Sequence, residues 1–83
     1  MDKSVEEKEI NSRQKVYDFL INYIVDNGFA PSIREIAEGT DIKSTSSVYY
    51  ILSILETMGK IHMEKNKQRA IKIIGYEFVK VGK

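Results

Sequence analysis

The chain has 83 residues, of which 42% are hydrophobic and 30% are charged, and its formal net charge at pH 7 is +1. This composition is typical of one small globular domain, which excludes several independent lobes, a disordered chain and a collagen-like repeat. Cysteine is absent, so disulfide frameworks, thiolate nucleophiles and cysteine-based zinc sites are excluded as well.

No stretch approaches the roughly 20 apolar residues that span a bilayer, and the N-terminus is acidic and polar, unlike a signal peptide. We therefore expect a cytoplasmic protein without a membrane partner. The charge is unevenly distributed along the chain, because the formal charges of residues 1–42 sum to −4 and those of residues 43–83 to +5. The second half is where a polyanion would bind, although such a basic half is also typical of a plain solvated surface.

Residues 1–10 alternate Glu with Lys without apolar periodicity, so we expect a flexible N-terminal leader. A first helix is predicted to begin at Asn11 or Ser12, either of which can cap it, and to end at Gly28. Pro31 then keeps the preceding residue out of the helical region. The predicted buried stripe of this helix, at spacings of three and four, is Val16, Leu20, Tyr23, Ile24 and Asn27, widened by Tyr17, Phe19 and Ile21.

A second helix is predicted to begin at Ser32, because Ser32-Ile33-Arg34-Glu35 has the capping-box pattern. Gly39 is expected to close this helix and to start a four-residue turn. A third helix follows, which Ser44 can cap and Gly59 is expected to end. Two helices joined in this way have the form of a helix-turn-helix, which also occurs in domains that do not touch DNA. The predicted buried stripe of the third helix is Val48, Ile51, Leu52, Leu55 and Met58.

Two short β-prone runs, 61–63 and 70–74, flank the polar stretch 65–69, which is typical of a hairpin tip. The predicted fold class is therefore α+β, mainly α: a winged helix-turn-helix of three helices followed by a two-stranded β-hairpin wing. In that architecture the third helix enters the major groove and the wing lies against the DNA backbone. We assign residues 11–75 to this domain and residues 76–83 to a tail, which is either the start of an interdomain linker or a loose strand.

The third helix has no charged residue from Ser44 to Leu55. Its side opposite Val48 collects hydroxyls and tyrosine, whereas a merely soluble face normally uses Glu and Lys, which are better helix formers. Contact with a DNA groove explains why hydroxyl residues replace Glu and Lys on this face, because phosphates repel carboxylates while hydroxyls form hydrogen bonds to base edges. Tyrosine-rich faces also form protein contacts, so a winged-helix protein-interaction module using Tyr49, Tyr50 and Ile54 stays open.

The stretch from Arg13 to Ile73 resembles the N-terminal DNA-binding domain of LexA repressors. The features that carry the resemblance are Arg13-Gln14, Gly28 with Pro31-Ser32 before residues 34–37, the Ser-rich opening of the third helix, Leu55-Glu56 with Gly59 and Ile61, and Arg69-Ala70-Ile71. The resemblance implies a repressor that binds one half of a palindromic operator in double-stranded DNA, usually near DNA-damage (SOS) genes. It also implies a bacterial, nucleoid-associated protein, mainly monomeric in isolation, of which two copies can lie side by side on a palindrome.

Carried over by position, the resemblance implies base contacts from the start of the third helix. These residues are Ser44, Ser46, Ser47, Tyr49 and Tyr50. The backbone-contacting residues that we predict are Ser32, Arg34, Lys43, Thr45, Lys65, Lys67 and Arg69, although a solvated hairpin turn would also carry such charges. The two tyrosines depart from the family, whose proteobacterial members carry an acidic pair there and whose Gram-positive members place a His at position 49. The resemblance therefore implies the docking mode and not the operator sequence.

We expect no enzymatic activity, no cofactor and no metal. Full-length LexA repressors continue into a self-cleaving Ser/Lys peptidase domain that is absent from this chain, which is either a fragment or a stand-alone relative. His62 alternates with Ile61 and Met63, so it is predicted to point outward from the wing, and a lone His without a partner is no general base.

Overall fold

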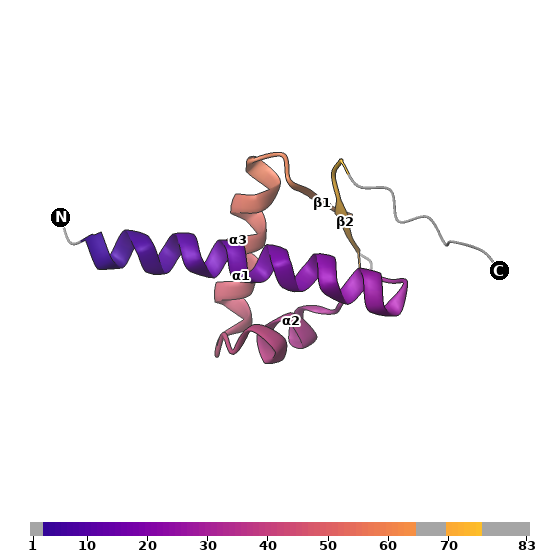
Figure 1. Cartoon of the computed structure of the whole chain (residues 1–83), viewed down its shortest axis with the longest axis horizontal. Helices are drawn as coiled ribbons and strands as arrows, with labels where there is room; N and C mark the ends of the chain where they lie inside the picture. Colours follow the sequence, from indigo (N-terminus) through magenta and orange to yellow (C-terminus); the bar gives the residue numbers. More distant parts are fainter. Residues whose placement is uncertain (1–2, 65–69, 76–83) are drawn as a thin grey trace.

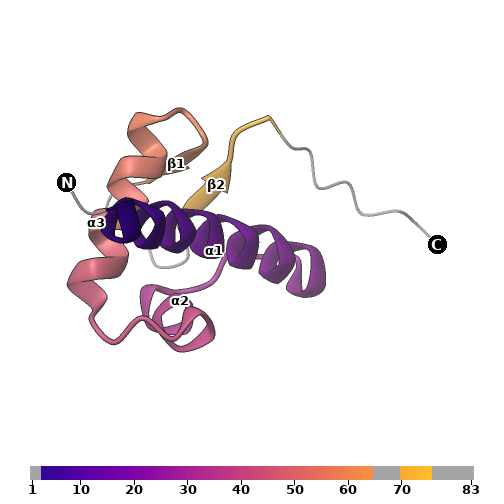
Figure 2. The same ribbon diagram turned by 60° about the vertical axis from the view of Figure 1, so that its left-hand side comes forward.

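A computed structural model describes the backbone of residues 3–64 and 70–75, and the side chains from residue 11 onward within those ranges. Helices α1 (Lys3–Asn27), α2 (Ile33–Thr40) and α3 (Thr45–Thr57) precede the strands β1 (Ile61–Met63) and β2 (Ile71–Ile73). In Figure 1, α1 runs across the molecule and α3 crosses α1 steeply. Helix α2 lies below the C-terminal half of α1. Both Figure 1 and Figure 2 show α2 near the N-terminal end of α3 and the start of the hairpin at the C-terminal end of α3. The predicted fold class, a mainly α winged helix-turn-helix, is confirmed.

Helix α1 begins at Lys3, so the predicted start at Asn11 or Ser12 is wrong. The range 3–27 contains neither Gly nor Pro, and its first turns are rich in Glu and Lys, which are good helix formers. Figure 1 shows this N-terminal part extending beyond the other elements. The division into leader (1–10), domain (11–75) and tail (76–83) stays a prediction, and the tail lies outside the described residues. No helix in the described ranges is long and apolar enough to cross a membrane.

The core lies where the three helices and the hairpin meet, and it confirms most of the predicted stripes. Its buried apolar residues are Val16, Leu20, Ile24, Ala30, Ile36, Val48, Ile51, Leu52, Leu55, Ile61, Ile71 and Ile73. Met58 was expected among them but is 54% exposed. It is the C-cap residue of α3, where the chain leaves the helix, so the helical spacing no longer directs it inward. Asn27, the last residue of α1, is also exposed, and its Nδ2 donates to the Tyr23 carbonyl at 2.9 Å.

Helix α2 begins as predicted, but Gly39 does not end it. The helix continues to Thr40, and Asp41 takes the left-handed conformation with φ 58°. A Cβ atom on Gly39 would overlap the ring of Phe19, so glycine is needed here for the close approach of α2 to α1. The turn of the helix-turn-helix therefore consists of residues 41–44.

Gly59 ends α3 as predicted. It takes a positive φ of 76°, its N–H bonds to the Glu56 carbonyl at 2.9 Å, and the Lys60 N–H bonds to the Leu55 carbonyl at 3.0 Å. This pair of bonds is the Schellman motif. The chain then enters the hairpin, in which β1 and β2 pair antiparallel with His62 opposite Lys72. The start of the wing is thus tied directly to the end of α3.

Candidate nucleic-acid interface

The five residues predicted to contact bases all lie exposed on the first two turns of α3 and at its N-cap. The tyrosine side chains are the largest among them, and Tyr49 is 53% and Tyr50 61% exposed. Burial of Val48 and Leu52 on the opposite side fixes the rotation of the helix about its axis. The structure therefore brings Ser44, Ser46, Ser47, Tyr49 and Tyr50 together on one end of one helix.

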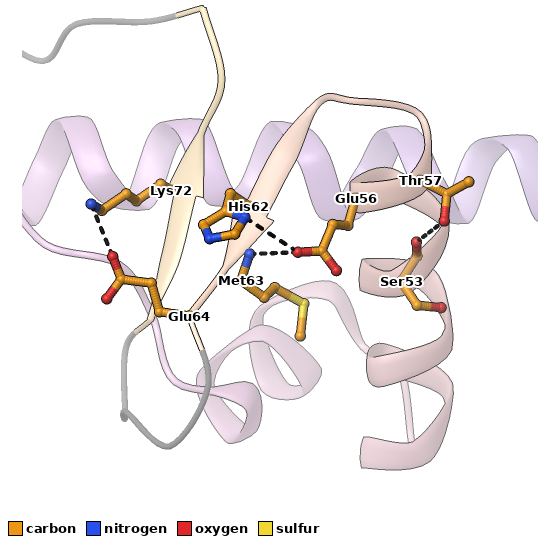
Figure 3. Close-up of polar contacts among 7 residues, drawn as sticks. All are labelled: Ser53, Glu56, Thr57, His62, Met63, Glu64 and Lys72. Atoms are coloured by element: carbon orange, nitrogen blue, oxygen red, sulfur yellow. Dashed lines mark hydrogen bonds and ion pairs between the residues drawn. The ribbon is translucent and has the colours of Figure 1, made fainter.

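The hydroxyl groups along α3 fall into two kinds. Toward its C-terminus, Ser53 Oγ donates to the Tyr50 carbonyl at 2.7 Å. Thr57 Oγ1 likewise donates to the Ser53 carbonyl at 2.9 Å (Figure 3). At the other end, Ser44 makes no side-chain capping bond. The Ser53 and Thr57 hydroxyls thus donate to carbonyls of their own helix, whereas the Ser44 hydroxyl makes no capping bond to the start of α3.

The N-terminus of α3 is electrostatically suited to an anion. Ser44 takes the extended conformation of an N-cap, and the first turn contains no acidic residue. The first backbone amides of a helix have no partner within it, and they form the positive end of the helix dipole. Lys43 and Thr45 beside this end are both exposed. The predicted phosphate contacts of these two residues are therefore geometrically accessible.

The N-terminus of α2 is arranged differently. Ser32 Oγ accepts from the Glu35 N–H at 3.2 Å, and Glu35 Oε1 accepts from the Ser32 N–H at 2.8 Å. The other carboxylate oxygen accepts the Tyr23 hydroxyl at 2.8 Å, which ties this cap to α1. Ser32 is half-buried in this network, whereas Arg34 is exposed. Of these two predicted backbone contacts, Arg34 is thus the more accessible.

The predicted phosphate contacts Lys65, Lys67 and Arg69 lie outside the described residues. At the base of the wing, two contacts appear that were not predicted from the sequence, and both are drawn in Figure 3. Lys72 Nζ lies 2.9 Å from Glu64 Oε1 across the hairpin. Glu56 Oε2 accepts from the Met63 N–H at 2.9 Å. Of these two contacts, only the ion pair of Lys72 with Glu64 could be anticipated from the sequence, because opposite charges stand near facing positions of two predicted strands.

His62 is exposed on β1, as predicted, and its Nδ1 lies 3.6 Å from Glu56 Oε2. No group of three or more His, Cys, Asp or Glu residues that could hold a metal ion occurs in the described part of the chain.

Lys60 lies over the ring of Tyr17, with Nζ 5.0 Å from its centroid, so this cation packs against α1. Lys72 is exposed at the base of the wing.

Comparison with known proteins finds one family over most of the chain. Residues 7–70 match the LexA DNA binding domain. The LexA repressor of Clostridium novyi is 40% identical over 74 residues, which are 89% of this chain and 34% of that protein. The LexA repressor of Herpetosiphon aurantiacus is 45% identical over 65 residues, 78% of this chain and 30% of that protein. That of Bifidobacterium adolescentis is 42% identical over 74 residues, 88% and 29% of the two chains. The chain thus spans about a third of the length of these curated relatives.

Proposed function

Because this chain belongs to the LexA DNA-binding domain family, we propose that it binds one half of a palindromic operator in double-stranded DNA and represses genes of a DNA-damage (SOS) regulon. The family resemblance drawn from the sequence is confirmed by the match over residues 7–70. The observation that carries the proposal is the opening of α3, which is exposed, free of charged side chains and free of an acidic first turn.

In this proposal α3 lies in the major groove, where hydroxyls bond to base edges and tyrosine rings contact thymine methyl groups. The base-contacting residues are Ser44, Ser46, Ser47, Tyr49 and Tyr50. The phosphate-contacting residues are Ser32, Arg34, Lys43, Thr45, Lys65, Lys67 and Arg69. Support comes from the exposure of every described member except the half-buried Ser32.

Each chain occupies one half-site and is mainly monomeric in isolation, and two copies lie side by side on the palindrome. Binding to operators places the protein on the bacterial nucleoid. The role proposed for this chain is recognition of DNA, without chemistry of its own.

A second candidate is a protein-docking module, which the exposure of Tyr49 and Tyr50 favours. Tyrosine is enriched at protein interfaces, because its ring supplies contact area and its hydroxyl a hydrogen bond. Ile54 beside them is half-buried and would extend such a surface. The two candidates differ in their response to salt, since counterion release makes DNA binding strongly salt-dependent.

The test is an amide chemical-shift titration of the protein with a palindromic duplex, at low and then at physiological salt. We expect salt-sensitive shifts at residues 44–50 and 65–69. Ser46→Glu should abolish binding, while Asn22→Glu, an equal charge change on the exposed side of α1, should weaken it little. An absence of duplex affinity at either salt would contradict the proposal and direct the search to a protein partner.

A further inference from the structure

Strand β1 has one neighbouring strand in a two-stranded sheet, so the backbone groups on its other edge need partners from elsewhere. The Glu64 N–H bonds to the Ala70 carbonyl at 2.9 Å, and the Ile74 N–H bonds to the Lys60 carbonyl at 3.0 Å. In an antiparallel ladder the groups that face the partner strand alternate along the chain. The N–H of Met63 therefore points away from β2.

Glu56 provides the partner for this N–H. Its carboxylate Oε2 accepts from the Met63 N–H at 2.9 Å and lies 3.6 Å from Nδ1 of His62, as Figure 3 shows. Glu56 belongs to the last turn of α3, and its side chain is 40% exposed. A side chain of the proposed recognition helix thus takes the place that a third strand would hold at the edge of the wing.

Apart from the Schellman bonds at the end of α3, the packing of the hairpin on the core is apolar, and the contact of Glu56 adds a direction to it. Ile61, Ile71 and Ile73 bury one face of the hairpin on the core. Apolar contacts are non-directional, so by themselves they tolerate sliding and rotation of the hairpin. The Schellman bonds of Gly59 and Lys60 hold the start of the hairpin at the end of α3, but they lie away from the far end of β1. The hydrogen bond at Met63, the last residue of β1, is directional and lies at the far end of this strand from Gly59.

We propose that Glu56 is a positioning residue that holds the wing in one orientation relative to α3, so that both meet the same duplex at once. This inference deepens the proposed function and rests on it for its effect on DNA binding. Glu56 contacts no DNA in this arrangement. It acts through Met63, by setting the direction of β1, and its carboxylate oxygen Oε2 lies 3.6 Å from Nδ1 of His62.

The first test separates the hydrogen bond from the charge. Glu56→Gln keeps an oxygen that can accept from Met63 but removes the charge, and Glu56→Ala removes both. Residual dipolar couplings of the amides in α3 and β1 report their relative orientation without DNA. We expect the native orientation in Glu56→Gln and a changed one in Glu56→Ala, together with faster hydrogen exchange at Met63. An unchanged orientation in both variants would overturn the inference, whether or not the protein binds DNA.

The second test uses a salt series of duplex affinities. We expect Glu56→Ala to lower the magnitude of the logarithmic salt slope by about 1 to 3, since each lost wing phosphate contact removes about 0.9. Preference among duplex sequences should persist, because α3 itself is intact. Glu56→Gln should keep the native slope. Equal slopes in the Gln and Ala variants would overturn the inference, and so would a loss of sequence preference in the Ala variant alone.

Glu56→Asp is a milder variant that keeps the charge and withdraws the carboxylate by one methylene group. It should follow Glu56→Ala in both tests and replaces it if the Ala variant does not fold. Failure of the proposed function has a different signature: the native protein would then bind no duplex at any salt, while the dipolar couplings would still decide the role of Glu56.

Discussion

The two helices of the helix-turn-helix both start at a serine, and the two ends differ in what their amides meet. At α2, Ser32 and Glu35 satisfy each other's backbone N–H groups in a complete capping box. At α3, Ser44 makes no side-chain cap bond and the first turn contains no acid. The same residue type at the same helical position thus closes one helix end and leaves the other open.

This difference gives the two helix starts different contributions to stability. An N-cap bond typically contributes about 1 kcal/mol to stability, so α3 forgoes roughly that amount at its start. What it retains is a set of amide donors and a positive dipole end, which attract phosphate. We infer that the open end is the one used for binding, and the predictions below test this by exchanging the properties of the two ends.

The largest effect is expected from Ser47→Glu, which gives α3 the Ser-x-x-Glu spacing of α2. A new capping box should stabilise the fold by about 1 kcal/mol. The carboxylate should lower duplex affinity by about 3 kcal/mol, roughly a hundredfold, because in the proposed complex it enters a groove whose phosphates repel it. Thermal unfolding and fluorescence anisotropy with a labelled duplex measure the two changes.

Ser47→Gln is the matched control for this exchange, because Gln can complete the same box without a charge. It should gain similar stability and keep most of the duplex affinity. Undiminished affinity in Ser47→Glu would show that the start of α3 is not part of the interface.

An intermediate effect is expected from replacing each N-cap serine by alanine. Ser32→Ala should lower the free energy of unfolding by about 1 kcal/mol, since it removes a cap bond. Ser44→Ala should change stability by less than about 0.5 kcal/mol and weaken duplex binding by up to about tenfold, because it removes one proposed hydrogen bond to a base edge. Chemical denaturation and anisotropy, run on both variants, show whether Ser32 serves stability and Ser44 serves binding. An equal loss of stability in Ser32→Ala and Ser44→Ala would contradict the comparison.

The smallest effect is expected at the other end of α3. Ser53→Ala and Thr57→Ala remove hydroxyls that bond to carbonyls of their own helix. Each should change duplex affinity by less than about 0.5 kcal/mol, and stability should rise slightly because Ala is the better helix former. Ser46→Ala, measured alongside by the same anisotropy assay, should lose clearly more affinity. A larger loss at Ser53 than at Ser46 would place the DNA farther along the helix.

The features that the sequence predicted correctly depend on the spacing of residues that are close in the chain. The capping box at Ser32, the left-handed stop at Gly59 and the buried stripe around Leu52 each depend on residues within a turn or two of one another. Such patterns specify a local structure with few alternatives. The exposure of the residues at the start of α3 follows from the same periodicity.

The parts that were wrong or missed depend on contacts across the fold. Gly39 carries the signature of a helix stop, and sequence cannot tell that signature from a glycine required by the neighbouring Phe19 ring. The contact of Glu56 has no signature, because its partner is a backbone N–H group of Met63. The predicted phosphate contacts at residues 65–69 lie outside the described part of the chain, and they stay predictions.

Helix α3 also shows how a domain of this kind can change its target. Its place in the fold is held by Val48, Ile51, Leu52 and Leu55, and none of the residues proposed to read bases belongs to that buried set. If α3 binds DNA as proposed, substitutions on its outward side alter recognition at little cost in stability, since surface changes typically stay within about 0.5 kcal/mol. After duplication, two copies of such a gene could diverge in operator preference one residue at a time, through intermediates that all fold.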